Sequence, residues 1–181
     1  MNSLANTSQN RAGRRAIALL GSAVFLVIAP GGVAFLVPWW LTHYHLEPPL
    51  LGLAVTRLVG FLMMVWSVPV LLGSFWRFAT EGLGTPAPVM PPEHLVVRGY
   101  YRHVRNPMYV AVVAMILGEG LFLGNARLLV YAAAVWLAMH TFVVLYEEPT
   151  LRLMFDGEYE EFCRRVPRWV PRWKAWTGEE R

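Results

Sequence analysis

Apolar residues fall into four long stretches along the chain, separated by shorter polar segments. The stretches cover residues 16–41, 50–79, 107–123 and 128–146. An α-helix needs about 20 mostly apolar residues to cross a bilayer, and only helices or closed barrels satisfy their backbone hydrogen bonds there. The pattern therefore predicts an all-α, polytopic membrane helical bundle with about four transmembrane helices.

The first two stretches each contain a feature that needs an explanation. Pro30, Gly31 and Gly32 interrupt the first one, and arginines precede it, so a secretory signal peptide is the alternative to a span. Because the hydrophobicity resumes from Val33 to Trp40, we favour one kinked span with a tryptophan anchor. In the second stretch, Arg57 lies near the helix start, where its side chain can reach the interface.

The polar segments differ from one another in pattern. Residues 80–106 are rich in proline and glycine and have no helical apolar stripe, which indicates a long loop with a fixed, irregular path. After residue 146, apolar positions recur at helical spacing with charges on the other side, which predicts an amphipathic helix on the membrane or folded under the bundle. Its stripe consists of Leu151, Phe155, Tyr159, Phe162 and Val166.

Composition agrees with the bilayer as solvent. Of the 181 residues, 56% are hydrophobic and 15% are charged, which is more apolar surface than a soluble domain of this size buries. The length fits one domain, residues 1–181, with a flexible tail over 1–15 and two spans over 16–79. The single cysteine excludes an internal disulfide, and we expect no metal site.

Basic residues predict the orientation of the bundle. Lysine and arginine gather before the first span, in the loop over 80–106 and after residue 146, whereas residues 42–49 contain none. The positive-inside rule then places both termini and the long loop in the cytoplasm. Because orientation explains the pI near 9.6, we do not expect nucleic-acid binding.

Two polar clusters should meet at the cytoplasmic end. One covers residues 94–109, and the other contains His140, Tyr146, Glu147, Glu148 and Arg152. A short turn at 124–127 makes the last two spans a helical hairpin, so their cytoplasmic ends are neighbours. Asn106 and Pro107 have the residue types of a helix cap and first turn, and the free N–H groups of such a helix start can also receive an anionic ligand group.

The paired carboxylates admit two interpretations. His140 and Glu147 are two helical turns apart and share a face. If Pro149 ends the span, Glu148 is pushed out of helical geometry, and the two adjacent carboxylates can then face different partners. An interfacial ion pair with Arg105 or Arg152 is the alternative to a functional role.

The basic tryptophan-rich segment with Trp169, Trp173 and Trp176 is predicted to form an interfacial belt.

Three pieces of the sequence resemble a known superfamily. They are "EHLVVRGYYRHVRNPMY", the helix end "HTFVVLYEE" and "LRLMFDGEYEEFCRRVPRWVP", in this order over residues 80–171. They resemble the isoprenylcysteine carboxyl methyltransferase and phospholipid methyltransferase superfamily of integral membrane enzymes. The matching positions are Gly99, Tyr101, Arg105 to Tyr109, Glu147, Glu148, Phe155, Tyr159 and Val166 to Arg168.

The resemblance implies a chemistry and a set of site residues. The superfamily transfers a methyl group from S-adenosyl-L-methionine to a lipidic acceptor, which makes residues 80–181 the cofactor-binding and catalytic part. The implied cofactor-binding residues are His94, Leu95, Val96, Tyr101, Asn106, Pro107, Met108, Tyr109 and Glu148. We expect Arg105, His140 and Glu147 to act in catalysis, by orienting the acceptor or accepting its proton.

Two departures from the superfamily pattern keep the acceptor open. In "FDGEY", Asp156 displaces the usual glycine, which alters a turn. The isoprenylcysteine enzymes also carry an arginine implicated in binding the substrate carboxylate, and "TFVVLY" has none, so either Arg105 or Arg152 replaces it or the acceptor is not a carboxylate. Two other classes are kept as alternatives: a small multi-span transporter or scaffold, and a nicotinamide-dependent membrane reductase.

Overall fold

The computed structural model describes residues 20, 21, 23–81 and 95–177. Every regular element in these residues is helical, and none of them is in a strand. A first helix, Ala23–Thr42, is followed by α3 (Val55–Glu81), α4 (Pro107–Leu123), α5 (Ala126–Phe142) and α6 (Glu148–Arg165). The predicted all-α bundle is confirmed. The proposed tail at 1–15 and His94 lie outside the described residues.

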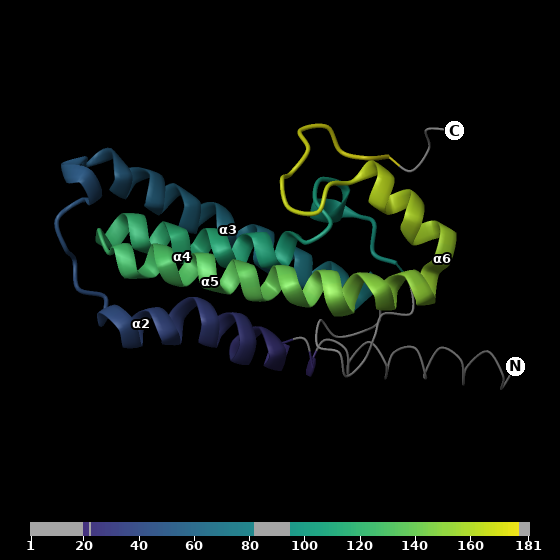
Figure 1. Cartoon of the computed structure of the whole chain (residues 1–181), viewed down its shortest axis with the longest axis horizontal. Coiled ribbons are helices and arrows are strands. Elements are labelled where there is room, and N and C mark those ends of the chain that lie inside the picture. The colour runs from purple at the N-terminus through teal and green to yellow at the C-terminus, as the bar shows by residue number, and fades with distance from the viewer. Residues whose placement is uncertain (1–19, 22, 82–94, 178–181) are drawn as a thin grey trace, which may run out of the picture.

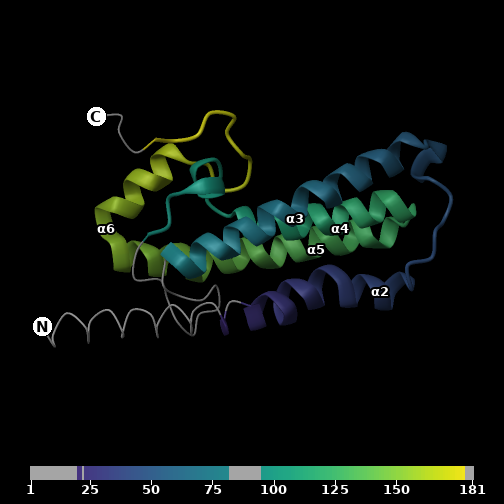
Figure 2. The same cartoon turned by 180° about the vertical axis from the view of Figure 1, so that it is seen from behind.

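Among the residues that the structure describes, three helices are long and apolar enough to cross a membrane. They are Ala23–Thr42, Val55–Glu81 and the continuous helix Ala126–Arg165, while Pro107–Leu123 is apolar but shorter. Helices α3, α4 and α5 run alongside one another, and the first helix lies along the α4–α5 pair on the side away from the start of α3 (Figure 1 and Figure 2). The bundle matches the predicted fold class.

The hairpin between α4 and α5 follows from local sequence. Pro107 occupies the first turn of α4, where its missing N–H removes no helical hydrogen bond. Gly124 ends the helix with φ of 76°, a conformation that glycine adopts without strain. Asn125 caps α5, because its side-chain oxygen accepts a hydrogen bond from the Arg127 N–H. The predicted bounds of the third span and the predicted turn are confirmed.

Two of the prolines that lie inside continuous helices, Pro38 and Pro149, each follow a wider helical turn. The π-helical segment Gly32–Leu36 comes just before Pro38 in α2 (Val37–Thr42), and the π-helical segment Val143–Glu147 comes just before Pro149. In the second, the Glu148 N–H donates to the Val143 carbonyl, five residues earlier. A π turn widens the helix locally and is a common irregularity within α-helices.

Pro149 therefore does not end the fourth span. Glu148 has φ of −62° and ψ of −44°, which are helical values, and α5 continues through the π turn into α6. In the first span, which Pro30, Gly31 and Gly32 interrupt in the sequence, Pro30 is helical and the irregular turn begins at Gly32. In both helices the chain continues through the wider turn without a break.

The chain turns back within α6. Asp156 has non-helical torsions, φ of 36° and ψ of −120°, and after it α6 bends away from the axis of α5 (Figure 1). The predicted stripe becomes buried there: Tyr159, Phe162 and Val166 pack with Val96 and Tyr101. The alternative in which α6 folds against the bundle is therefore the one observed.

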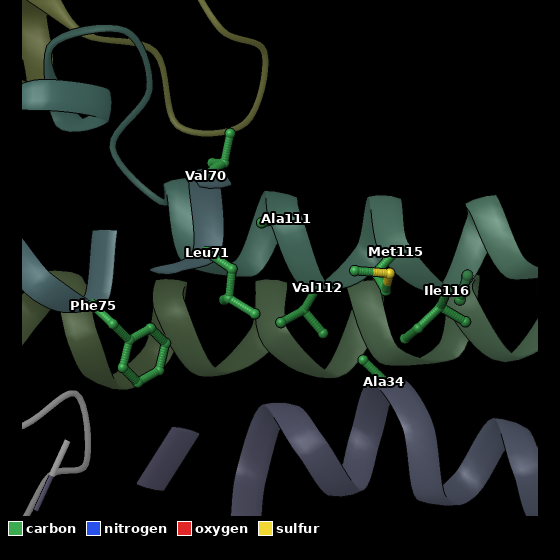
Figure 3. Close-up of a cluster of buried hydrophobic side chains, with 9 residues drawn as sticks. Ala34, Val70, Leu71, Phe75, Ala111, Val112, Met115 and Ile116 are labelled. Atoms are coloured by element: carbon green, nitrogen blue, oxygen red, sulfur yellow. The ribbon is translucent and has the colours of Figure 1, made fainter. Parts of the chain in front are cut away.

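The core of the bundle lies where α3, α4 and the first helix meet. Figure 3 shows Ala34 of the first helix on the side that faces Val112 and Ile116 of α4. At the other end of the α3–α4 contact, the backbones touch at two glycines. A Cβ at Gly60 would lie 2.5 Å from the Gly118 carbonyl oxygen, so only a residue without a side chain fits.

The loop between the first helix and α3 closes one end of the bundle. The Glu47 N–H donates to the Leu123 carbonyl at 2.8 Å, and the Asn125 amide donates to the Glu47 carboxylate at 2.6 Å. Arg57, in the first turn of α3, reaches the Glu47 carbonyl at 2.6 Å, which agrees with the predicted orientation of its side chain toward this end. The opposite end carries residues 95–106, α6 and the segment 166–176.

The glycine contact between α3 and α4 generates a stability prediction. Gly60→Ala should destabilise the bundle by about 2 kcal/mol, because the added methyl group overlaps the backbone of α4. Gly32→Ala is the matched control, since a Cβ there meets nothing within 4 Å. Thermal unfolding in detergent should show a lower midpoint for the first variant only. Equal midpoints for both variants would contradict the close contact.

Candidate active site

A cavity of about 150 Å³ lies between the start of α4 and the junction of α5 with α6. Its walls come from the first helix, from α3, from the turn η3 (Gly99–Arg102) and its following residues, from α4 and from the α5–α6 junction. The lining residues are Phe25, Ala29, Pro30, Val33, Phe75, Phe78, Tyr101, Arg105, Asn106, Pro107, Met108, Tyr109, Val112, Met139 and Glu147.

The cavity brings together most of the site residues predicted from the sequence. The ones that line it are Tyr101, Arg105, Asn106, Pro107, Met108, Tyr109 and Glu147. Leu95 and Val96 instead pack with Tyr101 in the hydrophobic cluster formed with Tyr159, Phe162 and Val166. His140 and Glu148 lie near the cavity but are not part of its lining.

Two polar atoms of the lining residues are buried without a hydrogen-bond partner in the protein. They are the Tyr101 hydroxyl and the Arg105 Nε. Burial, helped by the nearby Glu147 carboxylate, raises the pKa of the Tyr101 phenol well above its usual value, so the group stays a neutral donor. Buried donors almost always have a partner, so these two atoms are available to a ligand in the cavity.

The adjacent carboxylates of Glu147 and Glu148 have different partners, as predicted, although a continuous helix carries both. Glu147 turns into the cavity and accepts a hydrogen bond of 2.9 Å from the Tyr109 hydroxyl. Glu148 is only 3% exposed and lies outside the cavity lining. Neighbouring residues on a helix point about 100° apart, which is enough to separate them.

Glu148 is the centre of an ion-pair cluster. The Arg168 guanidinium donates to both of its oxygens, at 2.6 and 3.0 Å, and the Arg105 Nη1 donates at 3.0 Å. Arg152 lies at 3.6 Å and is more exposed. The hydrogen bond to Glu148 raises the pKa of the Arg168 guanidinium above its usual value. The ion pair that the sequence left as an alternative is present, with Arg168 as a partner that the sequence did not indicate.

Hydrogen bonds join the segment after α6 to the residues just before α4. The Asn106 amide donates to the Arg168 carbonyl at 3.1 Å, and the Arg105 N–H donates to the Pro167 carbonyl at 2.9 Å. The predicted side-chain cap by Asn106 is therefore wrong, because its side chain makes no capping hydrogen bond. A tertiary contact replaces the local one.

The tryptophans of this segment are not a uniform interfacial belt. Trp169 donates to the His140 Nδ1 at 3.0 Å, and its ring lies 6.5 Å from that of Tyr109. Trp176 packs on Phe162, with ring centroids 6.0 Å apart. Only Trp173 is fully exposed among the three. His140 thus contacts the cavity wall through Trp169.

Several lining residues could not be found from sequence. Phe25, Ala29, Pro30 and Val33 come from the first helix, and the others are apolar residues of α3, α4 and α5. In an apolar span, a residue that lines a cavity has the same type as one that faces lipid. No signal in the sequence separates them.

A model of the phospholipid methyltransferase family matches residues 55–158. The chain belongs to this family. The matched segment runs from the start of α3 into α6 and includes most of the cavity lining. The first helix and Arg168 lie outside it, although both belong to the site described above.

A relative in fission yeast, Schizosaccharomyces pombe, is named protein-S-isoprenylcysteine O-methyltransferase. It is 32% identical over 81 residues, which are 44% of this chain and 34% of the yeast protein. The chain thus spans about a third of the length of the curated relative that it matches. The resemblance inferred from the motifs agrees with both comparisons.

The ion-pair cluster makes a testable prediction for this family member. Glu148→Gln should lower the free energy of unfolding by about 3 kcal/mol, because it leaves the partly buried guanidinium groups of Arg105 and Arg168 without a full counter-charge. Glu161→Gln is the control: that carboxylate also pairs with two arginines but lies at the surface, so the variant should unfold like the wild type. Unfolding curves that do not separate the two variants would show that Glu148 has no structural role.

Proposed function

We propose that the protein is an integral membrane methyltransferase that transfers a methyl group from S-adenosyl-L-methionine to a lipidic or amphiphilic acceptor. The observation that carries the proposal is the cavity with two unpartnered buried donors, Tyr101 Oη and Arg105 Nε, inside the segment matched by the family. The family's name supports the reaction class, and the motif resemblance supports the donor.

The residues present fit this donor chemically. Tyr101 Oη and Arg105 Nε can donate to its hydroxyl or carboxylate oxygens, and Glu147 can accept from its hydroxyl or ammonium groups. Phe75 and Phe78 supply flat apolar surface for a heterocyclic base. The cofactor supplies a methyl group already activated on a sulfonium. The protein then has to align the reactants and exclude water, which requires neither a metal nor a protein nucleophile.

The site residues divide into those that contact the ligand and those that position them. We assign ligand contact to Tyr101, Arg105 and Glu147, together with residues 106–109 at the start of α4. Glu148 holds the Arg105 side chain in place from outside the cavity, and His140 orients Trp169 against Tyr109. Residues 94–96 keep the cofactor-binding role that the resemblance implies.

The surroundings of the cavity support a lipidic acceptor and a cytoplasmic orientation. Its apolar walls come from helices that also face the bilayer, so a lipidic acceptor can reach it from the side. The donor is made in the cytosol, and most of the basic residues lie at this end of the bundle, which supports a multi-pass protein with both termini and the active site facing the cytoplasm. The acceptor group is an isoprenylcysteine-like carboxylate or a lipid head group, and the yeast relative's name, which specifies O-methylation of an isoprenylcysteine, is compatible with the first.

Calorimetry with S-adenosylhomocysteine tests donor binding. The wild type should bind it, and Tyr101→Phe should bind about fivefold more weakly, because one hydrogen bond from a neutral donor is lost. Tyr100→Phe is the matched control, since this neighbour is not part of the cavity lining. Binding of NADPH in place of S-adenosylhomocysteine would favour a reductase. Equal binding by wild type and Tyr101→Phe would remove Tyr101 from the site.

Membranes that contain the protein should transfer labelled methyl groups to an extractable lipid. Glu147→Gln should reduce this labelling by at least about tenfold, whereas Glu158→Gln, at an exposed position of α6, should not. Mild alkali then identifies the acceptor: a methyl ester releases its label as methanol, and a methylated amine keeps it. Labelling that does not depend on the protein at all would contradict the proposed function.

A further inference from the structure

A second hollow, a groove of about 570 Å³, lies on the opposite face of the first turns of α4. Val110 of α4 lines this groove, Met108 and Tyr109 line the cavity described above, and Pro107 borders both. Successive helical residues are about 100° apart, so Val110 points to a different side of the helix from Met108 and Tyr109. The groove is therefore a separate site from the cavity, with the first turns of α4 as the wall between them.

The groove has an apolar part and a basic part. Trp66 and Val70, from the membrane-spanning helix α3, form the apolar part together with Val110. His103 and Arg172 lie at the other end, where the segment after α6 crosses the turn before α4. No acidic residue is among the described residues that line the groove. An occupant with an apolar chain and an anionic head would match both parts.

The basic side chains retain hydrogen-bonding capacity for an anion. The Arg172 Nη1 donates to the Arg165 carbonyl at 2.8 Å, and no ion pair with a carboxylate is recorded for Arg172 in the described residues. The His103 Nδ1 lies 2.9 Å from the Arg172 carbonyl oxygen. Because a carbonyl only accepts, this nitrogen carries a hydrogen, and in the imidazolium form Nε2 carries a second hydrogen that can be donated to an anion.

We propose that this groove binds one anionic phospholipid of the bilayer. The phosphate lies between Arg172 and His103, since a guanidinium binds phosphate oxygens through two parallel hydrogen bonds. One acyl chain runs along Trp66, Val70 and Val110. A soluble phosphate would match the two basic residues but would leave the apolar part without a partner.

This lipid is not the methyl acceptor, because α4 separates the groove from the cavity. Its effect is on the segment 166–176, which the Arg172 N–H ties to the His103 carbonyl at 2.9 Å. The same segment holds Arg168 against Glu148. A bound lipid therefore stabilises the part of the protein that fixes Arg105 at the cavity. The proposal stands on the groove alone and does not depend on which methyl donor or acceptor is used.

Native mass spectrometry of the purified protein in mixed micelles tests the proposal. Given equal amounts of dioleoyl-phosphatidylglycerol and dioleoyl-phosphatidylcholine, the wild type should retain one phosphatidylglycerol preferentially. Arg172→Gln should lower this retention at least fivefold. Lys174→Gln removes the same charge two residues away, at an exposed position outside the groove, and should retain the lipid like the wild type. Equal losses in both variants would indicate general surface attraction and overturn the site.

A second variant tests the apolar part without changing any charge. Val110→Trp should fill the groove and lower phosphatidylglycerol retention at least fivefold, while S-adenosylhomocysteine binding in the cavity stays unchanged. Undiminished retention in this variant would overturn the placement of the acyl chain. Glycerol 3-phosphate has the same anionic group without acyl chains, and binding of it as tight as that of the lipid would show that the occupant is a soluble phosphate.

Discussion

The buried carboxylate of Glu148 is the contact on which the arrangement of this protein depends most. It receives hydrogen bonds from Arg168, after α6, and from Arg105, before α4, so it joins three segments that are distant in sequence. A buried charge is tolerated only when it is paired. The pairing therefore fixes where Arg105 lies, and with it one of the two unpartnered donors of the cavity.

The parts of the fold that the sequence predicted well depend on neighbouring residues. The bounds of α4 follow from Pro107 at its start and Gly124 at its end, and Asn125 begins α5 as a cap. The clustering of Tyr101, Tyr109 and Glu147 followed from the hairpin and the motif order, because a short turn brings the ends of two adjacent helices together. These are local constraints, and a single sequence contains them.

The parts that the sequence did not predict depend on contacts across the fold. Pro149 has the appearance of a helix end, but the π turn before it keeps the helix continuous. Asn106 has the type of a cap, yet its amide binds the Arg168 carbonyl instead. Trp169 has the type of an interfacial residue, yet it packs beside the cavity. In each case a tertiary partner overrides the local preference of the residue.

The two faces of α4 give the bundle two different hollows, one with unpartnered donors and the other apolar and basic. We propose that the methyl donor occupies the first of them. The most direct measurement is ultraviolet crosslinking of labelled S-adenosylmethionine to the protein, followed by peptide mapping. The account predicts label on residues 101–112 or on the peptide that contains Glu147, competed away by S-adenosylhomocysteine. Label that maps only to the groove residues Trp66 or Trp173, or that resists competition, would contradict it.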